Sequence, residues 1–399
     1  MKNSDRKNII QEVADSYVDR SLFSGIEWIA EKSGEIILSG KSGYQNFENK
    51  TPIPDDAVYR IYSMTKPITA VLALKLIERG DLHLYDPVSK FIPSFNDLMV
   101  LNPDGSMDPL SRPIIIEDLM THRSGLSYDF LLGCHVAPLY AENNISDDKS
   151  RSLEEVCDVL SNLPLAYQPG QKFNYSVSLD VLARIMEIIK EKDFLKILRE
   201  EIFIPLEMND TGFGVKNNNL KKLMSIYGAK HFKDIMDLKP HSLIETDVSM
   251  SNPHDKEETF RRGGTGLFST MKDFLSFSRM LLTGKSHTGE VILSKNMINF
   301  MKMNRLKKSQ LPLFPGAPTY YGYGFNLIGR VVVDQGQVMS LTGKNEFGWG
   351  GASSCYFWVD PDEDLVGIMM TQYIGSMWPI TDDIRTAIYQ AIDCLLYTS

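Results

Sequence analysis

The sequence has few cysteines and no long apolar run. Its 399 residues include only four cysteines, and no two of them form a C-x-x-C pair, so neither a zinc site nor a disulfide framework is indicated. Residues 1–21 are polar and lack the apolar core of a signal peptide, and no stretch approaches about 18 uninterrupted apolar residues. We therefore expect no membrane span, and we expect a cytoplasmic protein with reduced thiols.

Positive charge is also scarce. The 42 Lys and Arg residues are outnumbered by 51 Asp and Glu residues, which gives a formal net charge of −9. Binding of nucleic acid requires a basic face that displaces counterions from phosphates, and the sequence contains no basic stripe of this kind. Nucleic acid is therefore not an expected partner.

Several catalytic signatures are missing as well. The sequence contains no H-E-x-x-H, no P-loop, no G-x-G-x-x-G and no G-x-S-x-G nucleophile elbow, and its seven histidines show no metal-ligand spacing. The missing elbow disfavours the catalytic triad of an α/β-hydrolase. We expect neither a metal nor a cofactor.

Apolar periodicity predicts the secondary structure of the first part of the chain. Apolar residues at helical spacing predict an amphipathic helix within residues 1–21, and two β-rich runs that meet at Gly34 predict a hairpin. A short strand over 58–62 then leads into a helix over 65–79, whose apolar residues are too dense for one face. This helix is expected to be buried and to end at Gly80.

The middle of the chain has a different pattern from its end. Residues 81–265 alternate loops with helical patterns and lack regular strand pairs, and the clearest helical patterns in and beyond this region cover 153–163, 178–203 and 271–283. Beyond residue 320, strands are predicted in YGYGFNLIG, RVVVDQ, QVMSLTG, SSCYFWVD and DLVGIMMTQ, followed by a helix over 379–396.

These patterns predict an α+β fold in which both ends of the chain contribute to one antiparallel sheet flanked by helices. Residues 1–80 and 266–399 are expected to form an α/β domain, and residues 81–265 a mostly helical subdomain. Within the latter, residues 208–265 are the least periodic and are expected to hold long loops near the site.

Ser63-Met64-Thr65-Lys66 is an S-x-x-K tetrad at a predicted strand-to-helix junction. Side chains at i and i+3 share one helix face, so the Lys66 amine can reach the Ser63 hydroxyl. A neutral amine can remove the hydroxyl proton as the oxygen attacks a carbonyl, provided that burial lowers the pKa of the lysine well below about 10.4. The tetrad alone is a weak signal, because Ser and Lys three apart occur by chance in most chains of this length.

The surroundings of the tetrad carry a family resemblance. The stretch YRIYSMTKPITAVLALKLIERGDLHLYDPVSKFIP, followed by IIIEDLMTHRSGLSY, resembles class C serine β-lactamases, penicillin-binding proteins and their esterase relatives, above all the family VIII carboxylesterases. The resemblance extends over roughly residues 20–395 and implies a β-lactamase/transpeptidase-like fold. It also implies that Ser63 is the nucleophile and Lys66 its base.

Two further motifs support this resemblance. Phe173-Asn174-Tyr175-Ser176 resembles the tyrosine motif of the family, which implies that Tyr175 lies beside the nucleophile as a second proton carrier. Its pKa is expected to be depressed by the nearby lysine ammonium. The stretch Phe347 to Ala352 resembles the W-G-G form of family VIII esterases, which implies that Trp349, Gly350 and Gly351 bind substrate and that the backbone N–H groups of Ser63 and Ala352 form an oxyanion hole.

The resemblance also suggests two weaker assignments. Asp180 either orients the lysine–tyrosine pair from behind or is an exposed helix carboxylate, and Tyr128 either lines the acyl pocket or packs in the core. Two positions depart from the β-lactamase pattern: Val177 replaces the Asn of the tyrosine motif, and Trp349 replaces the Lys of K-T-G. Both changes remove polar groups that grip a β-lactam drug, so uncharged acyl substrates fit better.

The sequence therefore predicts a serine carboxylesterase that cleaves short-chain acyl esters through an acyl-enzyme on Ser63, with weak β-lactamase activity as a side reaction. Its partner is then a small-molecule ester. An acyltransferase, a D-amino-acid peptidase or a β-lactamase of the same fold remains open as an alternative. A receptor without catalysis is disfavoured, because Ser63, Lys66 and Tyr175 are all present.

Overall fold

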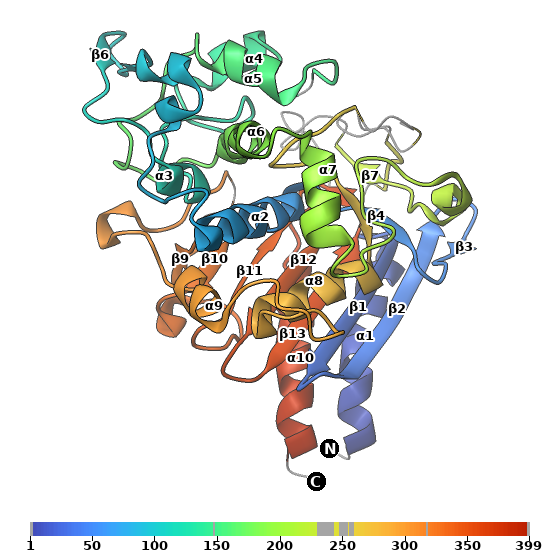
Figure 1. Ribbon diagram of the computed structural model, residues 1–399. Coiled ribbons are helices and arrows are strands. Elements are labelled where there is room, and N and C mark those ends of the chain that lie inside the picture. The colour runs from blue at the N-terminus through green and yellow to red at the C-terminus, as the bar shows by residue number, and fades with distance from the viewer. Residues whose placement is uncertain are drawn as a thin grey trace.

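The structure is a computed structural model that describes residues 3–146, 148–229, 243–246, 254, 259–316 and 318–396. Its centre is an eight-stranded antiparallel sheet with the order β3-β2-β1-β13-β12-β11-β10-β9 (Figure 1). The strands are β1 (Gly25–Lys32), β2 (Glu35–Asn46), β3 (Thr51–Pro52), β9 (Tyr323–Phe325), β10 (Arg330–Val332), β11 (Phe347–Gly350), β12 (Tyr356–Asp360) and β13 (Leu365–Thr371). Both ends of the chain contribute strands, which confirms the predicted α+β arrangement.

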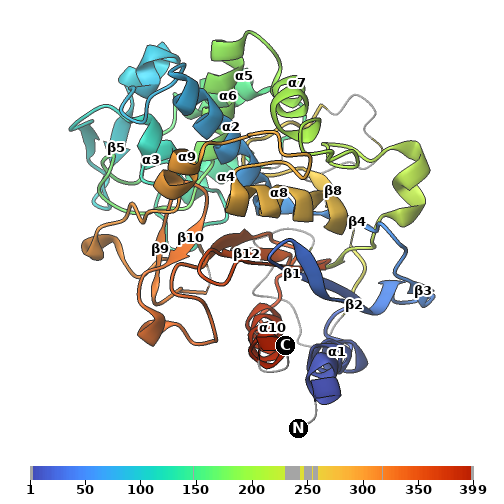
Figure 2. The same ribbon diagram turned by 60° about the horizontal axis from the view of Figure 1, so that its bottom comes forward.

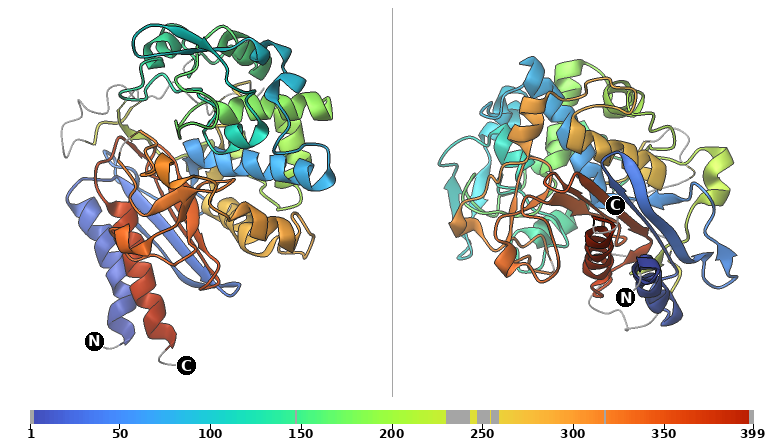
Figure 3. Two further views of the ribbon diagram at one scale, coloured as in Figure 1. Left: turned by 90° about the vertical axis from the view of Figure 1, so that its left-hand side faces the viewer. Right: turned by 90° about the horizontal axis from the view of Figure 1, so that it is seen from below.

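Helices cover both faces of this sheet. Figures 2 and 3 show the two terminal helices, α1 (Asn3–Asp19) and α10 (Ile380–Leu396), side by side on one face. The other face carries α2 (Thr65–Arg79), α8 (Met271–Thr283) and α9 (Lys295–Met301). Beyond α2 lie α3 (Ile116–Met120), α4 (Ala137–Glu142), α5 (Leu153–Leu160), α6 (Ser178–Lys190) and α7 (Phe194–Leu198).

The terminal helices pair because each has one apolar face. In α10, Ile384, Ile388 and Ile392 follow one another at intervals of four residues and are buried, as helical periodicity requires of a covered face. The hydroxyl of Tyr17 in α1 donates a 2.6 Å hydrogen bond to Asp383. The two predicted terminal helices are thus confirmed, and they bring the two ends of the chain together.

The helix that follows Ser63 is central, as its dense apolar pattern predicts. Residues 65–76 of α2 are all buried between the sheet side and the helices beyond it. Gly80 then ends the helix in the left-handed region, with φ of 80°. The predicted β1–β2 hairpin is also present, and positive φ values of 53° at Ser33 and 84° at Gly34 suit its two-residue turn.

One predicted strand is wrong. The segment QVMSLTG (337–343) alternates apolar and polar residues, but it does not form a strand. The side chain of Asp334 accepts the Gly336 amide and starts a single 3-10 turn over Gln335–Gln337, which leads the chain out of the sheet. The following stretch FGWG, expected only to precede a strand, is itself strand β11.

Two further differences concern the region between α2 and α8. A short pair, β5 (Met99–Leu101) and β6 (Met107–Pro109), lies within residues 81–265, where no strand pair is predicted. The helix predicted over 178–203 ends at Glu191, which has a φ of 49°, and continues as α7 and a π-helical turn. Much of the least periodic stretch, 208–265, lies outside the described residues.

Two smaller pairs connect the parts of the chain. β4 (Val58–Arg60) pairs with β8 (Phe268–Thr270), and β7 (Tyr227–Gly228) pairs in parallel with β14 (Tyr373–Ile374). The β4–β8 pair holds the chain on either side of the predicted site, because β4 leads to Ser63 and the residues just before β8 contact Lys66. Within the described residues, no helix is long and apolar enough to cross a membrane.

Candidate active site

Ser63 lies at the junction of strand and helix that the sequence predicts. After β4, one turn of 3-10 helix over Tyr62–Met64 leads directly into α2. Tyr62 has a φ of 42°, a left-handed conformation that is rare for a large side chain and typical of functional turns. In this turn Tyr62 and Met64 are buried, whereas Ser63 is only half-buried. Ser63 is therefore the most accessible of the three residues.

Lys66 is buried beneath Ser63. Its Nζ lies 3.1 Å from Ser63 Oγ and donates a 2.7 Å hydrogen bond to the main-chain oxygen of Gly264. Only 3% of the residue is exposed. Burial penalises the ammonium form and lowers the pKa of Lys66 to about 7, against the opposing charge of Asp180. A substantial fraction of this lysine is therefore neutral at neutral pH.

Tyr175 completes a compact group with these two residues. Its ring lies below Lys66 Nζ at 4.7 Å, and its hydroxyl accepts a 3.3 Å hydrogen bond from the indole N–H of Trp349. Burial raises the pKa of Tyr175, although hydrogen bonds to Ser63 and Trp349 act in the opposite direction. The expected depression of this pKa is wrong, because desolvation of a phenolate dominates and the neighbouring lysine is itself shifted toward its neutral form.

A pair of glycines that sequence reasoning missed shapes the floor of the site. Thr69 Oγ1 donates to the Gly263 oxygen at 2.6 Å, and Lys66 donates to the next carbonyl, that of Gly264. A Cβ on Gly264 would lie 2.9 Å from the Tyr128 hydroxyl and 3.2 Å from Lys66 Nζ, so the absence of a side chain creates the space for the lysine. The consecutive glycines of RRGGTG are the signal that could have found this segment.

Asp180 lies behind this glycine segment and is buried, not exposed. Its Oδ1 accepts the Gly264 N–H at 2.7 Å, so a single residue, Gly264, links the carboxylate to Lys66 through its N–H and its C=O. Burial raises the pKa of Asp180, and the Arg262 guanidinium acts most strongly in the opposite direction. Arg262 is itself buried and donates to the main-chain oxygens of Asp148 and Arg151.

The end of β11 packs against the turn that carries Ser63. A Cβ on Gly351 would overlap the main-chain oxygen of Ile61, so only glycine permits this close approach. The next residue, Ala352, packs against the small apolar cluster that contains Tyr62. The structure thus brings the predicted oxyanion segment and Ser63 together, although they are almost 300 residues apart in the sequence.

Aromatic side chains surround the group. Tyr128 is buried, its ring lies 5.1 Å from Lys66 Nζ, and it stacks on Phe130 at 4.7 Å. The ring of Trp349 is 5.5 Å from that of Tyr175, and the ring of Phe325 is 5.2 Å from that of Trp349. Trp349 and Tyr128 therefore both contact the predicted proton carriers directly.

His122 holds Tyr175 in place, and sequence reasoning did not single it out for this. Its main-chain oxygen accepts the Asn174 N–H at 2.8 Å, its Nδ1 accepts the Ser176 N–H at 3.3 Å, and its ring lies 4.6 Å from that of Tyr175. Burial holds the pKa of His122 well below its usual range, so the imidazole is neutral.

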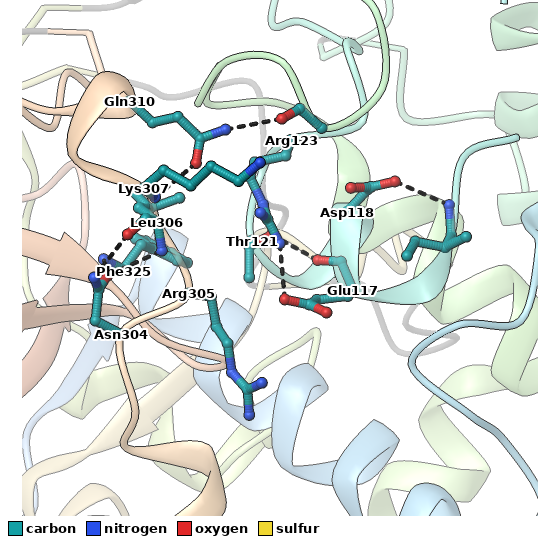
Figure 4. A network of polar contacts seen from close by, with 12 residues as sticks. Glu117, Asp118, Thr121, Arg123, Asn304, Arg305, Leu306, Lys307, Gln310 and Phe325 are labelled. Atoms are coloured by element: carbon teal, nitrogen blue, oxygen red, sulfur yellow. Dashed lines mark hydrogen bonds and ion pairs between the residues drawn. The ribbon is translucent and has the colours of Figure 1, made fainter. Parts of the chain in front are cut away.

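A polar network anchors the chain on either side of this histidine. Arg123 donates to Thr121 and to Glu117, each at 2.8 Å, and Gln310 donates to the Gly170 oxygen at 2.9 Å (Figure 4). The main-chain oxygen of Arg123 in turn accepts the Gly170 N–H at 2.7 Å. The segment that leads to Tyr175 is thus fixed from two sides.

The chain is similar in sequence to a known family and to several known proteins. A family model described as Beta-lactamase matches residues 10–388. Protein Rv1367c of Mycobacterium tuberculosis (strain ATCC 25618 / H37Rv) is 32% identical over 376 residues, which cover 92% of this chain and 89% of that protein. Esterase EstB of Burkholderia gladioli is 26% identical over 390 residues, which cover 93% of this chain and 92% of the esterase.

Solved structures with the same fold confirm the predicted architecture. EstCE1, described as a hydrolase with promiscuous acyltransferase activity, has a TM-score of 0.81 at 24% identity, covering 97% of this chain and 99% of that one. Unliganded simvastatin synthase LovD from Aspergillus terreus has a TM-score of 0.77 at 20% identity, covering 99% and 100%. The predicted β-lactamase/transpeptidase-like fold, with a large antiparallel sheet and flanking helices, is therefore confirmed.

Proposed function

Because the chain belongs to the β-lactamase family, we propose that it is a serine carboxylesterase that cleaves short-chain acyl esters through an acyl-enzyme on Ser63. One observation carries the proposal. The half-buried serine hydroxyl is 3.1 Å from a buried lysine whose pKa is lowered to about 7, which is the pairing that serine activation requires. A hydroxyl beside a charged lysine would have no acceptor for its proton.

Acylation follows from this pair. Neutral Lys66 takes the proton from Ser63 as Oγ attacks the ester carbonyl carbon. The carbonyl oxygen becomes an oxyanion between the backbone N–H groups of Ser63 and Ala352. Tyr175, which burial keeps protonated, donates its phenolic proton to the leaving alkoxide, and the Lys66 ammonium then returns a proton to Tyr175. The alcohol leaves, and the acyl group stays on Ser63.

Deacylation uses the same groups in reverse. A water molecule attacks the acyl carbonyl, its proton passes to Tyr175, and Tyr175 hands its own proton to neutral Lys66. Lys66 then protonates the departing Ser63 oxygen, which releases the carboxylic acid. The Trp349 indole N–H, which bonds the Tyr175 hydroxyl at 3.3 Å, keeps that oxygen in position through both half-reactions.

The proposed substrate class rests on the polar residues that the site lacks and on its apolar lining. Trp349 and Val177 replace the polar residues with which relatives of this fold grip the charged group of a β-lactam, and both are buried among apolar neighbours. A neutral ester suits such a lining better than a charged drug. Esterase EstB and a lovastatin esterase are among the relatives by name, which supports ester chemistry.

Acyl transfer is the second candidate, since EstCE1 carries a description of promiscuous acyltransferase activity. The two reactions share the acyl-enzyme and differ only in whether water or an alcohol accepts the acyl group. Hydrolysis of p-nitrophenyl acetate, butyrate and octanoate by the wild type and by Ser63→Ala tests the proposal, with a chromogenic cephalosporin measured in parallel.

We expect the short esters to be the best substrates and Ser63→Ala to lose at least about 1,000-fold in kcat. Wild-type rates in Ser63→Ala would refute the assignment, and a preference for the cephalosporin would refute the substrate class. An added alcohol that raises turnover well above the hydrolysis rate would identify a transferase. The absence of any p-nitrophenol release, burst or steady-state, would indicate a non-catalytic receptor.

A further inference from the structure

A buried arginine in β10 has no acidic partner among the residues that the structure describes. Arg330 in β10 is 4% exposed, and its Nε and Nη2 form no hydrogen bond within the part of the chain that the structure describes. Buried guanidinium groups are almost always paired with a carboxylate or with several oxygens, because an unpaired charge is costly to remove from water.

Three tyrosine rings enclose this guanidinium. Its Cζ lies 4.2 Å from the ring centre of Tyr323, 4.5 Å from that of Tyr356 and 5.1 Å from that of Tyr320. We call these four residues the Arg330 cage. Ring faces attract a cation, but they offer no acceptor in the plane of its N–H groups. The hydroxyl of Tyr356 is buried and also without a partner among the described residues.

The acidic groups nearby already accept hydrogen bonds from other residues. Glu346 accepts Arg385 Nη1 at 2.7 Å and the Tyr389 hydroxyl at 3.1 Å, and Asp382 accepts Arg385 Nη2 at 2.9 Å. Arg385 also donates to the Tyr323 hydroxyl at 3.0 Å, so a second buried guanidinium borders the cage. Neither carboxylate forms an ion pair with Arg330.

The cage lies where two core clusters meet. Tyr356 lies in the core cluster that the terminal helices cover. Tyr323 lies in the cluster that contains Tyr175 and Trp349, and Tyr320 packs against that second cluster. Tyr323 belongs to β9 and Arg330 to β10, so the cage lies at the β9 edge of the sheet.

We infer that the Arg330 cage binds a small carboxylate. The two open donors, Nε and Nη2, form the planar fork of a guanidinium that a carboxylate accepts with both oxygens, and the Tyr356 hydroxyl offers a third donor. Since the site is buried, the ligand is of the size of formate or acetate.

Thermal unfolding of the full chain in sodium formate, compared with sodium chloride at equal ionic strength, tests this inference. A ligand that binds only the folded protein raises Tm, and we expect formate to raise it by about 2 °C or more over chloride. Arg330→Gln should lose this increment. The matched control Lys344→Gln, which removes one positive charge from an exposed loop position, should keep it.

Calorimetric titration with sodium formate and sodium acetate gives a second readout if Arg330→Gln does not fold. Tyr356→Phe keeps the ring and removes one donor, so we expect it to weaken formate binding by roughly 5-fold to 10-fold. Equal Tm shifts in formate and chloride would overturn the inference, as would a full formate increment in Arg330→Gln. These experiments do not measure esterase activity. A negative result would therefore contradict this inference and leave the proposed function unaffected.

Discussion

Lys66 Nζ bonds the main-chain oxygen of Gly264 at 2.7 Å, which is closer than its 3.1 Å approach to Ser63 Oγ. The N–H of the same residue, Gly264, donates to Asp180. The lysine is therefore positioned by a glycine residue, and its charge is set by burial and by a carboxylate that lies behind that glycine. Four predictions follow from this arrangement.

The first concerns the pH dependence of activity. Only neutral Lys66 can accept the serine proton, and its pKa is about 7. We expect kcat/KM to fall about tenfold per pH unit below pH 7 and to level off above it. Tyr175 should add no basic limb below pH 10, because burial raises its pKa above that ordinary value. A pH profile with p-nitrophenyl butyrate, with a correction for spontaneous hydrolysis, measures both limbs.

The second prediction distinguishes the electrostatic effect of Asp180 on Lys66 from that of Arg262. The Asp180 carboxylate favours the charged form of Lys66, so Asp180→Asn should move the acid limb of kcat/KM to lower pH. Arg262 balances the Asp180 charge; in Arg262→Gln the carboxylate acts on Lys66 without that counter-charge, and the limb should move to higher pH. Arg262→Lys is the matched control and should restore most of the wild-type profile. Shifts of equal sign in both variants would contradict this electrostatic account.

The third prediction compares the two neighbouring glycines. A Cβ on Gly264 meets the Tyr128 hydroxyl and Lys66 Nζ, both of which are ends of side chains. Gly264→Ala should therefore fold, keep a near-normal KM and lose about 100-fold in kcat, because the lysine is displaced. A Cβ on Gly263 would overlap the main-chain oxygen of Leu179, so Gly263→Ala should lower Tm instead. Circular dichroism melting together with kinetics distinguishes the two effects.

The fourth prediction concerns stability. The pKa of Lys66 is about 7 in the folded chain and 10.5 as a reference, so the unfolded chain binds this proton more tightly. The resulting destabilisation is complete below pH 7 and vanishes as the pH rises through 10.5. We expect Lys66→Met to unfold with a free energy roughly 2–4 kcal/mol higher than the wild type at pH 7, and the gap to close toward pH 10. Urea unfolding at several pH values measures it; a gap that widens with pH would contradict the burial argument.

The helices and turns that the sequence predicts correctly depend on residues that are close together in the chain. The helix from Thr65 to Arg79, its left-handed end at Gly80 and the turn at Ser33-Gly34 all depend on residues close in the sequence, and the structure has each of them. The terminal helices and most strands of the sheet follow from periodicity in the same way. The false strand over 337–343 has the right alternation, but a turn at Asp334 takes it away from any partner strand.

Long-range contacts explain what the sequence could not show. Lys66 and Gly264 are 198 positions apart, and nothing local to either residue predicts their hydrogen bond. The pKa of Tyr175 depends on how completely neighbouring segments exclude water from it. An estimate from the lysine charge alone therefore gave the wrong direction. Asp180 could be placed behind the site only once the glycine segment was known to lie between it and Lys66.

The most direct test of the central claim is intact-protein mass spectrometry after acid quenching of the enzyme with p-nitrophenyl butyrate, followed by peptide mapping. The account predicts a butyryl adduct on Ser63 that accumulates within the first turnover and is absent in Ser63→Ala. An adduct on another residue, or turnover with no covalent species in either protein under the same quench, would contradict it.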